Sequence, residues 1–158
     1  MMKILYICTH NRCRSILAEA LSNHHGGGLL LARSAGSQPA GAVHPGTLAA
    51  LQAAGVPTDG LRSESWEAYA DFAPDLVLTL CASAAGESCP LWMGRSLKLH
   101  WGLADPSRSS GAQPQAAAFA ATVAAIEERV RALRAVASGP RADWPAALRA
   151  LVARDLPA

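Results

Sequence analysis

Short apolar runs alternate with amphipathic segments along this chain. Four short runs are rich in leucine, isoleucine or valine, which predicts buried strands over residues 3–8, 29–32, 76–80 and 96–100. Apolar residues recur at helical spacing between them, which predicts helical segments over residues 14–24, 44–55 and 65–69. This alternation predicts an α/β fold, a three-layer sandwich with a four-stranded parallel sheet covered on both faces.

The longest helical pattern lies in the C-terminal third of the chain, over residues 113–137. Its apolar residues repeat at spacings of four and three: Phe119, Val123, Ile126, Val130 and Leu133. Gly139-Pro140 ends this helix, and a last amphipathic helix is predicted over residues 145–154. We therefore expect one domain over residues 1–138 and a C-terminal helical extension over residues 139–158 without chemistry of its own.

Composition and charge exclude several classes of partner. The chain has 158 residues, a net charge of +2 and a pI near 8.5, without a cluster of lysine and arginine. This charge is too small to predict binding to nucleic acid or to an anionic membrane surface. The apolar run at the N-terminus is too short for a signal peptide, and the alanine-rich run at residues 116–126 is too short to cross a bilayer. We expect a cytoplasmic protein.

The most informative stretch is Cys8-Thr9-His10-Asn11-Arg12-Cys13-Arg14-Ser15, between the first predicted strand and the first predicted helix. A loop that opens a helix leaves several backbone N–H groups without an intrahelical partner. These donors and the positive end of the helix dipole make a site for a tetrahedral oxyanion. Residues 9–15 are therefore predicted to form an oxyanion-binding loop.

Two side chains of this loop carry predicted chemistry. The guanidinium of Arg14 can bind two oxygens of an oxyanion at once. Cys8 lies at the end of the strand and faces the same donors, where positive potential favours a nucleophilic thiolate. The alternative is a buried core cysteine beside a solvated helix arginine. The strand before the loop and the helix after it favour the catalytic interpretation.

Two further cysteines follow the predicted strand at residues 76–80. Cys81 therefore lies at the same carboxyl edge of the sheet as Cys8, and a linker of small residues joins it to Cys89. Disulfide exchange requires a thiolate to reach the previous sulfur, so this arrangement suits a relay of thiols. The alternative is that both are small buried residues. The cysteines lack the C-x2-C spacing of most zinc sites, which disfavours a zinc site.

A third part of the candidate site is Asp105, on the loop after the fourth predicted strand. A carboxylic acid at this edge of the sheet can protonate a leaving oxygen. The alternative is an ordinary Asp-Pro turn with Pro106. Within the oxyanion loop, we expect His10 to line the entrance. Cys13 is expected to be an accessory thiol that could form an off-pathway disulfide with Cys8 on oxidation.

The signature Cys8-x5-Arg14-Ser15 directly after the first strand resembles the low-molecular-weight protein tyrosine phosphatase family. Residues 81–90 are similar to the redox segment of the thioredoxin-coupled arsenate reductases of that fold. The tyrosines that commonly follow the Asp-Pro pair in the phosphatases are replaced here by Ser107-Arg108. The resemblance covers residues 2–137, and it implies a low-molecular-weight phosphatase-like fold of the reductase type.

This resemblance implies an activity, the reduction of arsenate to arsenite for arsenic detoxification. Cys8 would attack arsenate held by the loop and Arg14, and Asp105 would assist the departing oxygen. Cys81 and Cys89 would then carry the disulfide to the surface. No tightly bound cofactor is expected, because a reduced dithiol carrier would supply the electrons: thioredoxin, or a glutaredoxin or mycothiol system. Weak phosphatase activity is expected alongside.

The family also implies supporting roles for buried polar residues. In related reductases, residues that match Asn11 and Ser15 hold the loop in shape by hydrogen bonds. Some relatives bind potassium beside the loop, which implies a potassium site near Asn11, Glu19 and Ser34 in this chain. Ser65 stands where a further, acidic potassium ligand is expected. No other metal site is predicted.

Two other functions remain open from the sequence. A low-molecular-weight phosphotyrosine phosphatase would need only Cys8, Arg14 and Asp105. A non-enzymatic thiol sensor or metal-binding protein would use the cysteines without turnover. The alternatives differ in what Cys81 and Cys89 do, because a reductase requires both of these thiols and a phosphatase requires neither.

Overall fold

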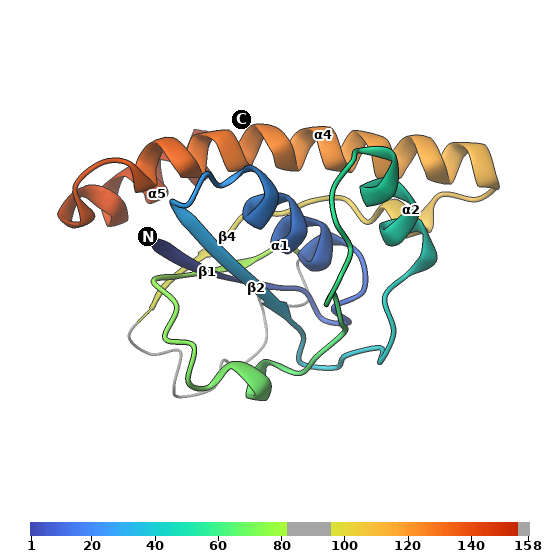
Figure 1. Ribbon diagram of the computed structural model, residues 1–158, viewed down its shortest axis with the longest axis horizontal. Helices are drawn as coiled ribbons and strands as arrows, with labels where there is room; N and C mark the ends of the chain where they lie inside the picture. The colour runs from blue at the N-terminus through green and yellow to red at the C-terminus, as the bar shows by residue number, and fades with distance from the viewer. Residues whose placement is uncertain (82–95, 155–158) are drawn as a thin grey trace.

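The computed structural model describes residues 1–81 and 96–154 of the chain (Figure 1). Its centre is a parallel four-stranded sheet with the strand order β2-β1-β3-β4. The strands are β1 (Met2–Ile7), β2 (Leu30–Ala35), β3 (Leu76–Thr79) and β4 (Leu97–His100). The predicted four-stranded parallel sheet is confirmed.

Helices and short 3-10 turns connect the strands and follow the last of them. They are α1 (Arg14–His25), α2 (Pro45–Ala53), η1 (Trp66–Tyr69), η3 (Pro106–Arg108), α4 (Ala112–Ala137), η4 (Arg141–Asp143) and α5 (Trp144–Arg154). The predicted helical segments are present within two residues of their expected bounds, and the segment at residues 65–69 is a 3-10 turn. None of the described helices combines the length and apolarity that a membrane span requires.

The second strand is longer than the sequence pattern indicates. We predicted that the strand ends at Ala32 and that a loop follows, but β2 continues to Ala35. Parallel pairing with β1 extends over Ser34 and Ala35. Ser34 is fully buried, and its hydroxyl donates a hydrogen bond of 2.6 Å to Glu19. The strand accommodates this polar residue because its hydroxyl has buried partners.

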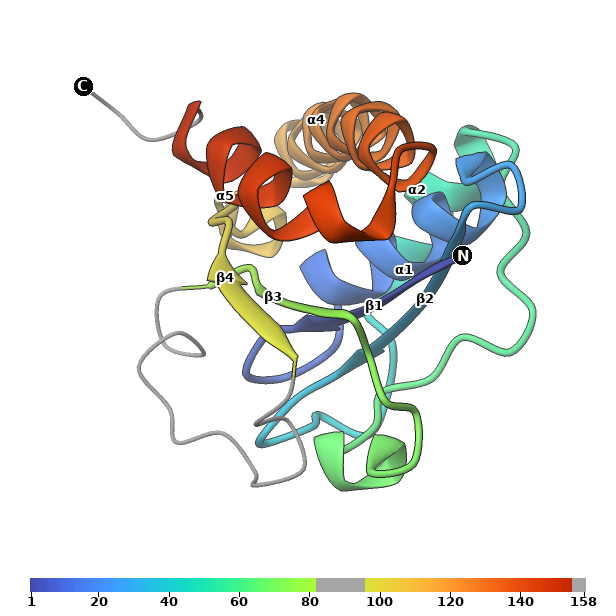
Figure 2. The ribbon, with the colours of Figure 1, turned by 90° about the vertical axis from the view of Figure 1, so that its left-hand side faces the viewer.

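The two faces of the sheet are covered differently (Figure 2). Helices α1, α2, α4 and α5 lie on one face and build the main core with it. Successive strand residues point to opposite faces. Those that face the helices include Ile4, Tyr6, Leu76 and Leu78. The opposite face presents Leu5, Ile7 and Val77 to Trp66, Tyr69 and Phe72, which belong to η1 and the residues after it. The sheet therefore lies between a thick helical layer and a thin second layer.

The carboxyl ends of β1 and β3 meet at the centre of the sheet. From β1 the chain crosses to β2 on one side, and β3 then pairs with β1 on its other side. Open parallel sheets form ligand sites where the strand order reverses, because the loops diverge there and leave a crevice. Cys8 directly follows β1, and Cys81 lies two residues after Thr79, the last residue of β3. The fold therefore brings the two predicted reactive cysteines to adjacent strand ends.

The C-terminal helix α5 packs into the main core. Its buried side chains are Trp144, Leu148, Leu151 and Val152. Just before it, Arg141 donates a hydrogen bond of 2.7 Å to Asp75 and lies over the ring of Trp144, 4.3 Å from the ring centroid. Asp75 also accepts a hydrogen bond from the backbone N–H of Lys3. Both apolar packing and polar contacts therefore attach α5 to the sheet.

Replacement of Leu148 by alanine tests whether α5 is part of the folding unit. Leu148 is 3% exposed, and loss of a buried leucine side chain costs about 2–5 kcal/mol of unfolding free energy. We expect a clear fall in the urea midpoint, followed by circular dichroism. Arg149→Ala, on the exposed side of the same helix, is the matched control and should leave the midpoint unchanged. Equal midpoints for the two variants would contradict the role of α5 in the core.

Candidate active site

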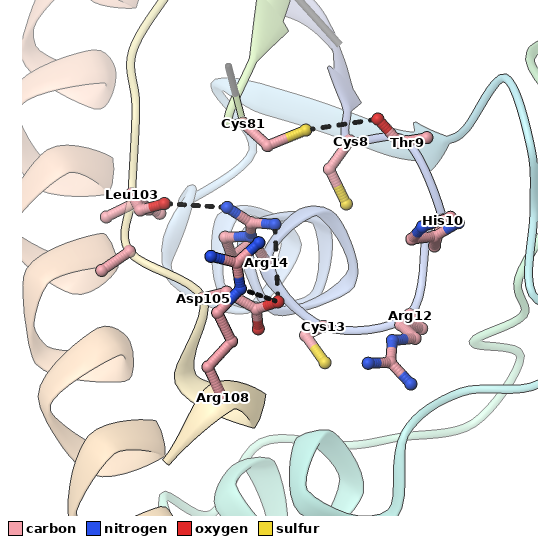
Figure 3. Close-up of a pocket in the computed structure, with 11 residues that line it drawn as sticks. Cys8, Thr9, His10, Arg12, Cys13, Arg14, Cys81, Leu103, Asp105 and Arg108 are labelled. Atoms are coloured by element: carbon pink, nitrogen blue, oxygen red, sulfur yellow. Dashed lines mark hydrogen bonds and ion pairs between the residues drawn. The ribbon is translucent and has the colours of Figure 1, made fainter. Parts of the chain in front are cut away.

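Loops that follow β1, β3 and β4 line a cavity of about 380 Å³ (Figure 3). The lining residues are Cys8, Thr9, His10, Arg12, Cys13, Arg14, Cys81, Leu103, Ala104, Asp105 and Arg108. Asn11 and Ser15, the other two residues of the predicted oxyanion loop, are fully buried and support it. The cavity therefore collects the oxyanion loop, the second cysteine and the predicted acid.

Three carbonyl oxygens of the oxyanion loop accept hydrogen bonds from the chain segment that follows β2. The carbonyls of Thr9, His10 and Arg12 accept hydrogen bonds of 2.9–3.1 Å from N–H groups of residues 38–44. In a trans peptide unit the C=O group and the following N–H group point in opposite directions, and no described peptide bond is cis. The N–H group of each of these units is therefore directed toward the inside of the loop, where it can donate a hydrogen bond to an oxyanion.

A buried chain of hydrogen bonds runs from Cys8 to Glu19. Asn11 donates its side-chain N–H groups to the hydroxyls of Ser15 at 2.8 Å and Ser34 at 3.0 Å. Because both hydroxyls accept these bonds, their own protons point to other partners. Ser34 donates to Glu19, and Ser15 lies 3.1 Å from the sulfur of Cys8. The Ser15 hydroxyl is thus oriented to stabilise a thiolate at Cys8. Glu19 accepts the last hydrogen bond of this chain, and burial raises the pKa of its carboxyl group.

Asn11 and Gly36 fix the path of the loop. Asn11 has a φ of 47°, a left-handed conformation that asparagine adopts more readily than most residues. Its side-chain oxygen accepts a hydrogen bond of 2.7 Å from the N–H group of Glu64. A Cβ atom at Gly36 would lie 2.4 Å from the carbonyl oxygen of Thr9. Only glycine permits this close approach between the end of β2 and the loop.

The residues of the predicted potassium site bond directly to one another. Asn11 turns its nitrogen toward Ser34, and its oxygen is engaged by the N–H group of Glu64. The hydroxyl of Ser34 donates to Glu19, while that of Ser65 accepts from the N–H group of Glu67. Hard cations require several converging oxygen atoms. In this arrangement Asn11 directs its amide nitrogen, not its oxygen, toward Ser34, and the potassium site near Asn11, Glu19 and Ser34 stays a prediction.

Arg14 is held at the cavity by the segment that follows β4. Its Nη1 donates a hydrogen bond of 2.9 Å to the carbonyl oxygen of Leu103, and its Nη2 lies 3.8 Å from a carboxylate oxygen of Asp105 (Figure 3). About 17% of the Arg14 side chain is exposed, so solvent screens this ion pair only partly. The guanidinium is therefore placed beside the loop before an anion binds.

The carboxylate of Asp105 lies among donors and cations. It accepts hydrogen bonds from the N–H group of Ser107 at 2.9 Å and from its hydroxyl at 2.7 Å. Partial burial alone would raise the pKa of this carboxyl. The Ser107 hydrogen bonds and the charges of Arg14 and Arg12 outweigh burial, so the pKa of Asp105 lies below its usual value. Asp105 is therefore ionised at neutral pH in the resting site.

The segment that carries Leu103 and Asp105 is itself anchored to α4. Arg129 donates hydrogen bonds of 2.8 Å to the carbonyl oxygens of Trp101 and Gly102. Its guanidinium also lies over the buried ring of Trp101, 4.4 Å from the ring centroid. The N–H group of Leu103 donates to the carbonyl of Leu80, next to Cys81. These contacts fix the segment relative to both α4 and β3.

Cys81 faces the oxyanion loop. It is 8% exposed, and its sulfur lies 3.5 Å from the hydroxyl oxygen of Thr9 (Figure 3). Thr9 is the residue after Cys8, so the second thiol lies against the loop that holds the first. Cys89, the predicted third thiol, lies outside the described residues.

Cys13 has a different environment from Cys8. It is 3% exposed, and burial is the main reason that the pKa of its thiol is raised. A raised pKa keeps the thiol protonated at neutral pH, where a thiol is a poor nucleophile. This supports the expectation that Cys13 is an accessory thiol.

Most of the residues that line the cavity were predicted from the sequence. The sequence did not predict that Arg108 and Leu103 line the cavity, or that Arg129 anchors the segment behind them. In the sequence, Arg108 is distinguished only by its place near the Asp-Pro pair, where the phosphatases commonly carry tyrosines. Its position two residues after the Asp-Pro pair could have placed it at the cavity. No sequence pattern connects Arg129 to Trp101.

Sequence comparison finds relatives over most of the chain. Residues 3–140 match the family of the low molecular weight phosphotyrosine protein phosphatases. An arsenate reductase of Bacillus licheniformis is 33% identical over 116 residues, which cover 73% of this chain and 82% of that protein. The chain is thus similar to a reductase over about four fifths of the length of that reductase.

Comparison with solved structures also finds arsenate reductases. An arsenate reductase in its phosphate-binding state matches with a TM-score of 0.70 at 30% identity, covering 85% of this chain and 98% of that one. A thioredoxin-dependent arsenate reductase of Corynebacterium glutamicum matches with a TM-score of 0.67 at 28% identity, covering 87% of this chain and 62% of that one. The resemblance that the motifs indicated is confirmed. The chain belongs to the low molecular weight phosphotyrosine protein phosphatase family, and within it to the arsenate reductases.

Proposed function

We propose that this protein reduces arsenate to arsenite through a relay of Cys8, Cys81 and Cys89. One observation carries the proposal: Cys8 and Cys81 follow adjacent strands into one cavity, and Thr9 connects the loop of the first to the sulfur of the second. A phosphatase needs one nucleophilic thiol. A second thiol at the same cavity supports a reaction that ends in a disulfide.

The first step is the attack of Cys8 on the bound oxyanion. Loop N–H groups and Arg14 hold arsenate, and the Cys8 thiolate forms a bond to arsenic. One arsenic–oxygen bond breaks, and the departing oxygen takes a proton from Asp105. Asp105 is ionised before the anion arrives. A bound dianion adds negative charge beside it and draws Arg14 away, and both changes raise the pKa of the carboxyl.

The second step transfers two electrons to arsenic. The sulfur of Cys81 attacks the sulfur of Cys8, a disulfide forms between them, and the sulfur–arsenic bond breaks with its electron pair left on arsenic. Arsenic(V) becomes arsenic(III), and arsenite leaves. A hydrogen bond from the Thr9 hydroxyl would stabilise the Cys81 thiolate for this attack.

The third step regenerates Cys8. Cys89 attacks Cys81, the disulfide moves to the Cys81–Cys89 pair, and the thiolate of Cys8 is released. We propose that a reduced dithiol carrier then returns two electrons to this pair, without a tightly bound cofactor. Thioredoxin is the proposed carrier, because one matching structure is a thioredoxin-dependent arsenate reductase. A glutaredoxin or mycothiol system is the alternative.

The same site supports weak phosphatase activity. Cys8, Arg14 and Asp105 suffice for attack on a phosphate ester, since phosphate and arsenate have the same shape and charge. The other alternative is a non-enzymatic thiol sensor or metal-binding protein. Among the described residues, no three His, Cys, Asp or Glu side chains are grouped so that they could hold a metal ion.

Serine variants of the three cysteines test the relay. Arsenate-dependent oxidation of NADPH is followed with thioredoxin and thioredoxin reductase. Cys8→Ser and Cys81→Ser should lower turnover at least about 10³-fold, because each removes a sulfur that forms a bond in the reaction. Cys89→Ser should release one arsenite per enzyme and then stop. Phosphatase activity toward p-nitrophenyl phosphate is the internal control, which Cys81→Ser should retain. Sustained turnover by Cys81→Ser would contradict the relay.

The pH dependence tests Asp105 as the proton donor. A donor must be protonated in the complex, so kcat should fall as the pH rises through the pKa of Asp105 with the anion bound. Asp105→Asn should lower kcat by about 10²–10⁴-fold and remove this dependence. The control is Asp143→Asn, an exposed residue of η4, which should keep the parent profile. An unchanged profile in Asp105→Asn would assign the proton to another group.

A further inference from the structure

We propose that Arg12 and Arg108 are specificity-determining residues, which make the cavity select compact oxyanions in their doubly charged form. The Cys-x5-Arg-Ser signature specifies neither residue, because Arg12 is one of its five variable positions and Arg108 lies outside it. The inference rests on the proposed function for the identity of the substrate, arsenate, and adds the charge state that the site requires. Both side chains line the cavity together with Arg14.

Arg12 is held beside the acid segment from within the oxyanion loop. Its Nη2 donates a hydrogen bond of 3.3 Å to the hydroxyl of Ser107, which donates in turn to Asp105. The charge of Arg12 also acts on the Asp105 carboxyl and helps to lower its pKa. Its carbonyl accepts hydrogen bonds from the N–H group of His44 and the hydroxyl of Thr47, so the backbone at this position is fixed.

Arg108 approaches the Asp105 carboxylate from η3, three residues further along the same segment, whereas Arg12 approaches from the oxyanion loop. The Arg108 side chain runs from η3 toward Asp105 (Figure 3), and its Nε lies 3.9 Å from the carboxylate oxygen that also pairs with Arg14. The side chain is 87% exposed, so an anion can meet it on the way into the cavity. Arg12 and Arg108 therefore converge on the unit formed by Asp105 and Ser107.

The charges of the reacting groups explain why two further guanidiniums are needed. A Cys8 thiolate and a doubly charged oxyanion place three negative charges in the cavity, beside the Asp105 carboxyl, which is ionised until the anion arrives. Arg14 alone opposes them with one positive charge, and the α1 dipole adds about half of another. Like charges at contact distance repel strongly in a cavity that is partly shielded from water. Arg12 and Arg108 supply the compensation that allows thiolate and dianion to be present together.

The remaining wall supports a compact ligand. Among residues 1–81 and 96–154, the lining of this cavity includes no tyrosine, phenylalanine or tryptophan, the side chains against which an aromatic ester would stack. Polar and cationic side chains take their place. Binding in this cavity is therefore expected to depend on charge rather than on apolar contact, and to weaken as salt is added.

Binding of inorganic phosphate, measured by isothermal titration calorimetry, tests the proposal without any redox step. Phosphate is titrated above and below its second ionisation, each at low and at high sodium chloride. Arg12→Gln and Arg108→Gln should each weaken binding of the dianion by about three- to tenfold, and the double variant by more. The loss should be smaller for the monoanion, and the salt dependence of the double variant should be shallower than that of the parent.

Three further variants keep the result interpretable. Arg131→Gln, an exposed residue of α4, changes the net charge equally away from the cavity and should bind phosphate as the parent does. Arg12→Lys and Arg108→Lys keep the charge and should retain most of the affinity. Phosphate binding within twofold of the parent in the double variant, or an equal loss for both ionisation states, would overturn the proposal. Arsenate turnover is measured separately, so its absence with phosphate binding as expected would reject only the proposed function.

Discussion

The buried amide of Asn11 is the interaction on which the reactive loop depends. Its nitrogen donates to Ser15 and Ser34, and its oxygen accepts from the backbone of Glu64. These partners belong to α1, to β2 and to the connection before η1. An oxyanion site is effective when its donors are in place before the anion arrives. One fully buried amide, with both kinds of polar atom bound, holds three separate parts of the chain around that loop.

The segment at residues 101–105 is a second support, on the other side of the cavity. It accepts hydrogen bonds from Arg129 and Arg14 and donates one to the residue before Cys81. This anchored backbone segment carries the acid, holds Arg14 through Leu103, and bonds to the residue before the second thiol. In the proposed mechanism an arriving anion competes with Asp105 for Arg14, which pairs with this carboxylate in the resting site.

Stability and chemistry are separated in this fold. The helices build the main core on one face, with α5 adding apolar side chains from beyond the region that matches the family. The reactive groups gather at the carboxyl edge of the sheet, where the strand order reverses. The buried side chains of α5 therefore belong to the main core, and none of them lines the cavity that holds the reactive groups.

By itself, the sequence determined the strands, the helices and the oxyanion loop, because apolar periodicity and the pattern from Cys8 to Ser15 are local properties. The sequence pattern placed the end of β2 too early, because the pairing with β1 and the buried partners of Ser34 are not local properties. Tertiary structure alone decided that Thr9 lies against Cys81, 72 residues away, and that Arg14 is held by Leu103, 89 residues away. Such contacts exist only once parallel pairing has aligned the strand ends at one edge.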